Sequence, residues 1–124
     1  MTAKTLLLLG AANSGLCVLL GAFGAHALKA RLPADMLTIW ETGVQYHFFH
    51  ALGLILLGVL ALHWPGSALV RISGWLLLAG IVLFSGSLYL LTVTGVRWLG
   101  AITPFGGTAF IAAWVILCVA IVRS

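Results

Sequence analysis

The sequence predicts an all-α integral membrane protein: a four-helix bundle with a short interfacial amphipathic helix between spans one and two. Hydrophobic residues make up 63% of the chain and charged residues only 6%, whereas a soluble domain carries roughly 25% charged residues. One membrane span needs about 20 apolar residues, so a chain of 124 residues has room for four. We therefore expect a single transmembrane domain over residues 1–124.

The first expected span covers about residues 5–28, which is long enough to cross a bilayer. A cleaved signal peptide is the competing interpretation, because Lys4 precedes the apolar run and residues 25–27 (AHA) resemble a cleavage site. Cleavage there would leave three spans. We favour four spans because the apolar stretch is longer than the apolar region of a signal peptide.

The interfacial helix is expected at about residues 33–42. At helical spacing, Met36 and Trp40 share an apolar arc, and the polar side chains fall on the other arc. This pattern is typical of a helix that lies in the membrane interface, with its apolar side toward lipid or bundle. Gly43 would then permit a bend into the second span.

The remaining spans are expected at about residues 44–62, 69–94 and 102–122. Four spans place both termini at one end of the bundle, which we call the terminal end. The basic residues are single and scattered, which does not favour nucleic-acid binding and leaves the lipid bilayer as the main partner. They do not assign an orientation either, because three lie at each end: Lys4, Arg71 and Arg123 at the terminal end, and Lys29, Arg31 and Arg97 at the opposite end.

Polar side chains gather at the opposite end, because this topology brings the polar parts of several spans to the same level. Polar groups at the edge of a membrane span are costly, so they raise a functional question. We take as the candidate ligand-binding set, possible headgroup contacts included, His26, Glu41, Gln45, Tyr46, His47, His50, Tyr89 and Thr103.

Three functions compete for this set. The first is a polar pocket for a ligand, a lipid headgroup or another membrane protein. The second is a metal or haem site formed by His26, His47 and His50, since histidine is a common metal ligand. The third is a small oligomeric transporter, although such proteins usually carry a carboxylate at the membrane midplane. The simplest alternative to all three is that His47 and His50 bridge neighbouring helices, as the amide of Asn13 would.

Four blocks of the sequence carry a family resemblance: GAFGAHAL (21–28), WETGVQYHFFHALGL (40–54), FSGSLYLL (84–91) and LGAITPFGGTAFIAAW (99–114). In order and spacing they resemble the YgdD-type small membrane proteins, bacterial inner-membrane proteins with eukaryotic relatives. The resemblance covers nearly the whole chain. It implies a four-helix, multi-pass protein of the bacterial inner membrane, and it implies no activity, because the family has no established function.

We expect a binding or assembly component, with enzymatic activity left open but not favoured and with no catalytic residues assigned. We expect no cofactor, neither haem nor metal, because the histidines lack a matching set of carboxylates within the spans. A homo-oligomer remains open. Close helix packing is assigned to Gly21, Gly24, Gly86, Pro104, Gly106 and Gly107.

The start of the fourth span carries the sharpest structural expectation. Gly106 and Gly107 remove side chains from its first turn, which lets another backbone come close. We expect the second span to pack there, with one of its polar side chains meeting Thr103. The alternative is that the two glycines only permit tight packing against the third span.

Overall fold

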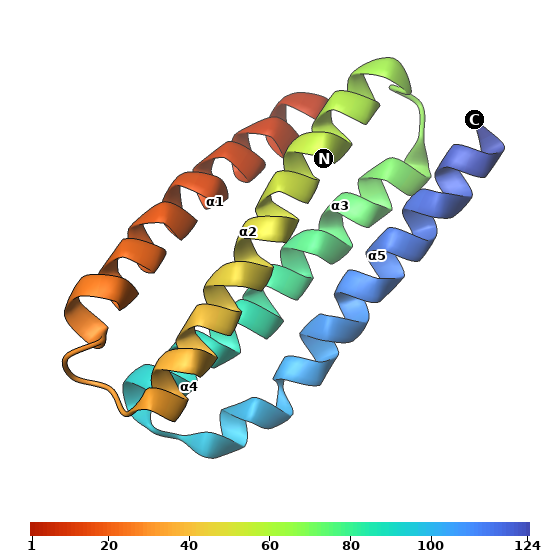
Figure 1. Cartoon of the computed structure of the whole chain (residues 1–124). Coiled ribbons are helices and arrows are strands. Elements are labelled where there is room, and N and C mark those ends of the chain that lie inside the picture. Colours follow the sequence, from red (N-terminus) through yellow and green to blue (C-terminus); the bar gives the residue numbers. More distant parts are fainter.

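A computed structural model describes residues 1–124, and it is all helical with antiparallel long helices (Figure 1). The prediction of an all-α protein with four spans is confirmed, because four helical stretches are long and apolar enough to cross a membrane. The elements are α1 (Ala3–Phe23) with the π-helical η1 (Gly24–Leu28), α2 (Ala34–His63), α3 (Ala68–Gly80) with the π-helical η2 (Ile81–Ser85), α4 (Gly86–Thr94), the 3-10 helix η3 (Arg97–Ala101), and α5 (Thr103–Arg123).

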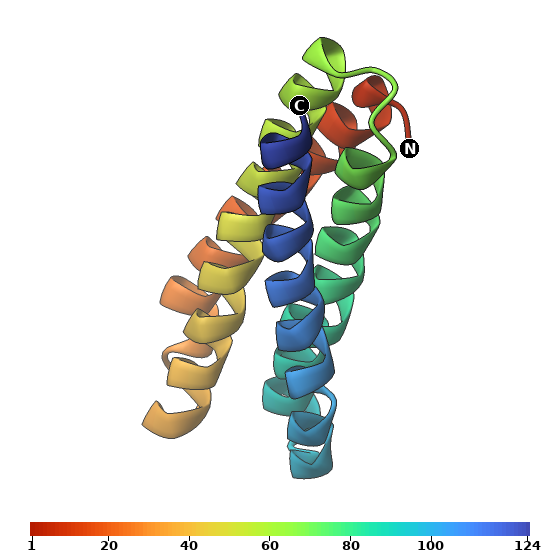
Figure 2. The same ribbon diagram turned by 90° about the vertical axis from the view of Figure 1, so that its right-hand side faces the viewer.

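The helices pack as two pairs. α1 packs chiefly on α2, and α3 packs chiefly on α5, while α2 also contacts α3, η2 and α4. Both termini and the α2–α3 turn lie at the same end (Figure 1). The two pairs lie close together at that terminal end and spread apart toward the opposite end (Figure 2). The α2 helix is therefore central and α1 is peripheral.

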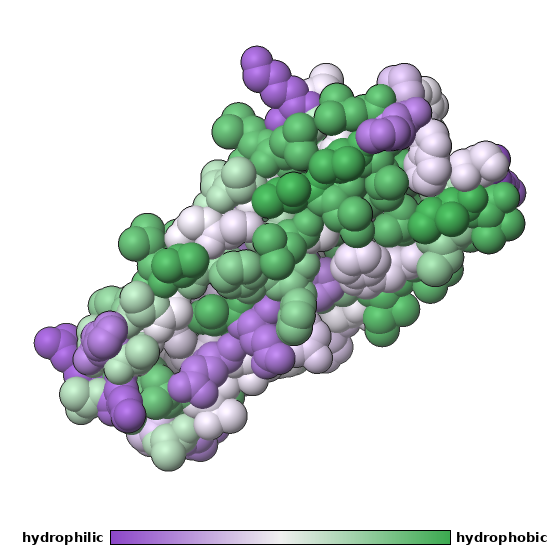
Figure 3. Space-filling view, turned by 45° about the horizontal axis from the view of Figure 1, so that its top comes forward, coloured by the Kyte–Doolittle hydropathy of each residue, from purple (hydrophilic) through white to green (hydrophobic).

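The core is apolar and lies between the two pairs. Leu6, Leu54, Leu57 and Leu77 are at most 1% exposed, and Phe110 closes the core from α5. The outer faces are also apolar, as the hydrophobic surface in Figure 3 shows. Lipid chains are the solvent that such faces require.

The segment expected as a separate interfacial helix is helical, but it forms the first turns of α2 and has no bend at Gly43. Gly43 instead lies buried against the Tyr89 ring. The indole of Trp40 packs against Tyr89 and donates from Nε1 to the Leu20 carbonyl at 3.0 Å. The apolar arc thus faces the bundle, and α2 runs unbroken through a glycine that sequence alone marks as a hinge.

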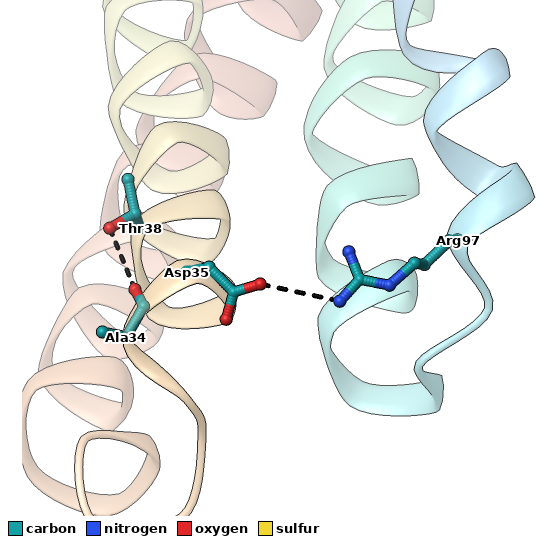
Figure 4. Close-up of polar contacts among 4 residues, drawn as sticks. All are labelled: Ala34, Asp35, Thr38 and Arg97. Atoms are coloured by element: carbon teal, nitrogen blue, oxygen red, sulfur yellow. Dashed lines mark hydrogen bonds and ion pairs between the residues drawn. The ribbon is translucent and has the colours of Figure 1, made fainter.

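An exposed ion pair joins the start of α2 to η3 at the opposite end (Figure 4). Arg97 Nη2 lies 3.5 Å from Asp35 Oδ2, with the two side chains 69% and 62% exposed. In the same turn of α2, Thr38 Oγ1 donates to the Ala34 carbonyl at 3.0 Å. Such an exposed pair contributes little to stability.

Glycines set the closest helix approaches. A methyl group on Gly106 would overlap the Phe84 backbone, and one on Gly24 would lie 2.6 Å from Trp40 Nε1. Gly21, Gly86 and Gly107 leave room for a methyl group, so they do not set a close approach. Tight contacts outside the set named above also occur at Gly10, Gly58, Gly74 and Gly80.

Two turn positions follow from local chemistry. Gly95 ends α4 in the left-handed region, with φ of 73°, and its N–H donates to the Leu91 carbonyl at 2.8 Å. Glycine adopts this conformation without steric cost. Pro104 occupies the first turn of α5, where its missing N–H costs no hydrogen bond.

Candidate functional site

His47 is the centre of a buried polar chain that links three helices. Its Nε2 lies 2.8 Å from Asn13 Oδ1 on α1, and its Nδ1 lies 2.9 Å from the Tyr89 hydroxyl on α4. The Asn13 amide nitrogen donates to the Leu9 carbonyl at 2.8 Å. This bond uses the amide N–H, so the oxygen faces the histidine and Nε2 carries the ring proton. The Tyr89 hydroxyl then donates to Nδ1 of a neutral imidazole.

The depth of His47 differs from the sequence interpretation, which put it at the edge of a span. It lies thirteen residues after Ala34 and sixteen before His63 in one continuous helix. At 1.5 Å per residue, these are about 20 Å and about 24 Å from the two ends of α2. The polar chain therefore crosses the bundle near its middle.

His50 makes a second junction, between α2 and α5. Its Nδ1 lies 2.6 Å from the Tyr46 carbonyl, and its Nε2 accepts from Trp114 Nε1 at 3.1 Å. Because an indole N–H can only donate, Nε2 is unprotonated and Nδ1 donates to the carbonyl. The imidazole also stacks on Phe110, with ring centroids 3.5 Å apart and planes 7° apart.

Both imidazoles are thus fully used by the protein. Each ring nitrogen of His47 and His50 has a hydrogen-bond partner within the chain. No buried side-chain nitrogen or oxygen in the molecule lacks a partner. The two histidines bridge helices, which is the simplest of the sequence interpretations, and ligation by either one would break an existing bond.

The three-histidine set does not assemble. His26 is exposed on η1 and makes no hydrogen bond to the other two histidines, which are buried. No group of three or more His, Cys, Asp or Glu side chains is placed to hold a metal ion. His26, His47 and His50 therefore do not meet at one site in this structure.

Thr103 also differs from the expectation that it meets the second span. Its hydroxyl lies 2.6 Å from the Ser87 hydroxyl, at the start of α4. Gly106 likewise packs on Phe84 in η2. The start of α5 therefore packs against the third span, and the alternative interpretation was the correct one. The second span meets α5 deeper, through His50.

The other members of the predicted set lie on the surface. Glu41, Gln45 and Tyr46 are exposed on α2. Hydrophilic side chains extend inward from the opposite end along the face drawn in Figure 3. The predicted set is thus divided between internal helix bridges and an exposed group, and it does not form one joined site.

The exposed group borders a groove of about 180 Å³ between α1 and α2. Gly21 of α1 and the small residues Gly24 and Ala25 of η1 form one side, and Trp40 lines the α2 side. Two polar side chains, Glu41 and Gln45, lie at the same groove. The only ion pair of the chain is Arg97–Asp35, so Glu41 has no cationic partner within the protein.

Several residues of the polar interior were not among the predicted site residues. Asn13 was recognised as polar, and its interhelical bond was expected, but its partner was not. Trp114 and Phe110 lie in the apolar part of α5, where their own side chains suggest packing or membrane contact and no polar network. Ser85 donates to the Gly43 carbonyl at 2.7 Å, and only the spacing of serines within a span could have drawn attention to it.

Comparisons with known proteins agree with this architecture. Residues 20–107 match the family model described as "Protein of unknown function (DUF423)". A UPF0382 membrane protein, YwdK of Bacillus subtilis, is 54% identical over 97% of this chain and 98% of its own length. The UPF0382 membrane protein SERP0230 of Staphylococcus epidermidis is 46% identical over 97% of each chain. No solved structure gives a significant match.

The fold and these matches define a class: a small bacterial multi-pass membrane protein. The chain belongs to the DUF423, or UPF0382, family of membrane proteins of unknown function. Its relatives are named as membrane proteins, in agreement with the predicted membrane localisation.

Proposed function

We propose that this protein is a binding component of the membrane and that the groove between α1 and α2 holds a phospholipid with an ammonium headgroup. One observation carries the proposal: the Glu41 carboxylate borders this groove and has no cationic partner within the chain. The buried polar side chains, in contrast, are all hydrogen-bonded internally. Glu41 is therefore available to a ligand, and the buried histidines are not.

The depth of the groove suits a headgroup. The helical stretch Ala3–Leu28 has 26 residues, about 39 Å, and exceeds the hydrocarbon thickness of about 30 Å. Gly24, at the groove, is four residues from the end of this stretch, which is about 6 Å. Glu41 would thus lie near the boundary between headgroups and chains. Gln45, one turn deeper, could donate its amide N–H to a lipid ester carbonyl.

The surrounding charges favour a zwitterionic lipid. Lys29 and Arg31 lie in the connection between η1 and α2, at the same end as Glu41. A phosphate can interact with these cations while an ammonium group donates to the carboxylate. An ethanolamine headgroup has the N–H donors that this arrangement requires, whereas a choline headgroup has none.

Native mass spectrometry of the detergent-purified protein, with phosphatidylethanolamine added, tests the proposal. Wild type should retain this lipid in preference to phosphatidylcholine and phosphatidylglycerol. Glu41→Gln should lower its occupancy about tenfold, the effect of one charge-assisted hydrogen bond of about 1.4 kcal/mol. Asp35→Asn is the matched control, because it removes a carboxylate of the same helix that already pairs with Arg97.

If wild type retains the three lipids equally, and Glu41→Gln does the same, the proposal is refuted. A dimer that loses its stability in the Glu41→Gln variant would instead assign the groove to a second copy of the chain.

We also propose that the YgdD-type proteins belong to this same family. The support is the resemblance of four sequence blocks, which include GAFGAHAL (21–28) and LGAITPFGGTAFIAAW (99–114). A pairwise alignment tests it: a YgdD-type sequence that fails to align over these blocks would separate the two groups.

A further inference from the structure

Two hollows flank the turn that joins α2 to α3 at the terminal end. One has a volume of about 390 Å³ and the other about 370 Å³. Trp64 and Ser67 border both hollows. Arg123 lines the first and Arg71 lines the second. Two adjoining hollows thus share a wall, and each is lined by one arginine.

The side-chain charge at this end is entirely positive. Both carboxylate side chains of the protein, Asp35 and Glu41, belong to α2 near the opposite end. Arg71 donates from Nη1 to the Pro65 carbonyl at 3.4 Å, which orients the guanidinium over the turn and leaves its other N–H groups free. The chain carboxylate at Ser124 borders only the first hollow. An anion is therefore favoured most strongly beside Arg71.

The start of α3 adds to this preference. Ser67 caps the helix, and its hydroxyl accepts from the Val70 N–H at 3.3 Å. The first N–H groups of a helix have no carbonyl partner within it, and their dipoles favour negative charge. Trp64 is half-buried between the hollows, and an indole at this position is typical of the headgroup region.

We infer that this end binds an anionic phospholipid with two phosphates, of the diphosphatidylglycerol class. One phosphate lies beside Arg71 and the other beside Arg123, with Trp64 between them. Guanidinium groups match phosphate oxygens with two parallel hydrogen bonds, and basic pockets between membrane helices hold such headgroups. The apolar residues of the hollows, such as Leu62 and Leu69, face the glycerol and the upper acyl chains. This site is independent of the α1–α2 groove.

The test uses native mass spectrometry of the full-length protein with diphosphatidylglycerol, phosphatidylglycerol or phosphatidylethanolamine. Wild type should bind one diphosphatidylglycerol per chain. Arg71→Gln and Arg123→Gln should each lower its occupancy about tenfold, the loss of one charge-assisted contact. Arg97→Gln is the matched control, because it removes the same charge at the opposite end. Glu41→Gln should leave this binding unchanged, which separates the result from the proposed function.

Two outcomes would overturn the inference. In the first, Arg97→Gln lowers binding as much as the other arginine variants, so that attraction is not local. In the second, two phosphatidylglycerol molecules bind per chain, as tightly as one diphosphatidylglycerol molecule does. No single lipid would then bridge the hollows. The unfolding temperature without lipid, measured for every variant, separates lost binding from lost fold.

Discussion

The chain Asn13–His47–Tyr89 gives a quantitative prediction, because one imidazole serves two partners. Tyr89→Phe removes the hydroxyl that donates to His47 Nδ1, and Asn13→Leu removes the acceptor of the Nε2 proton. In membrane proteins such hydrogen bonds contribute about 0.6 kcal/mol on average and up to about 1.7 kcal/mol. Each single variant should therefore lower the free energy of unfolding by about 0.5–1.5 kcal/mol.

The double variant should cost more than the sum of the single variants. In Asn13→Leu, the His47 proton can move to Nδ1 and donate to the Tyr89 hydroxyl, which keeps one bond. With both partners gone, the buried imidazole keeps an N–H with no acceptor, at a cost of about 1–3 kcal/mol. We expect a coupling energy of about 0.5–1.5 kcal/mol beyond additivity.

Denaturant titration in mixed micelles, monitored by tryptophan fluorescence, measures these four free energies. Leu8→Ala is a suitable control, because this α1 side chain is 66% exposed to lipid. Its effect on the free energy of unfolding should add to that of Tyr89→Phe. If Asn13→Leu and Tyr89→Phe also add to within about 0.3 kcal/mol, the imidazole does not couple α1 to α4 and the reasoning fails.

Two further predictions concern the start of α5. Gly106→Ala should lower the free energy of unfolding by about 1–3 kcal/mol, because the added methyl group meets the backbone of the third span. Gly107→Ala should change this free energy by less than about 0.5 kcal/mol. Similar losses for both variants in denaturant titration would contradict the packing. Cysteines at Ser87 and Thr103, in a background without the native cysteines, should form a disulfide under mild oxidation. Cysteines at Gln45 and Thr103 should not, and the reverse pattern would mean that the second span covers the start of α5.

Composition and hydropathy were sufficient to predict the number of spans, because lipid requires long apolar helices whatever their neighbours are. They could not predict which helices meet. Topology brings Gln45, Ser87 and Thr103 to one end of the bundle, but only packing decides that Thr103 meets Ser87. The chain has no charge pattern within the spans that would distinguish the two neighbours.

The same limit applies to the candidate site. His47 and Gln45 are two residues apart on one helix, yet the first is buried and the second is exposed. Spacing gives their relative angle on the helix but not which side faces the bundle. The glycine at position 43 is equally ambiguous, because it can be a hinge or a contact surface. In the structure Tyr89 packs against Gly43, so this glycine is a contact surface. A single sequence does not reveal that pairing.

The pairing of α1 with α2 and of α3 with α5 has a consequence for biogenesis. Asn13 and His47 can bond as soon as the first hairpin is inserted, and Ser87 and Thr103 can bond within the second. Three side-chain hydrogen bonds have to wait until both hairpins are present: His47 with Tyr89, Ser85 with the Gly43 carbonyl, and His50 with Trp114. Each half can therefore enter the bilayer with its own interhelical hydrogen bonds formed, and the three remaining bonds form when the halves meet. Two polypeptides separated at the α2–α3 turn should consequently find each other in the membrane and restore the complete protein.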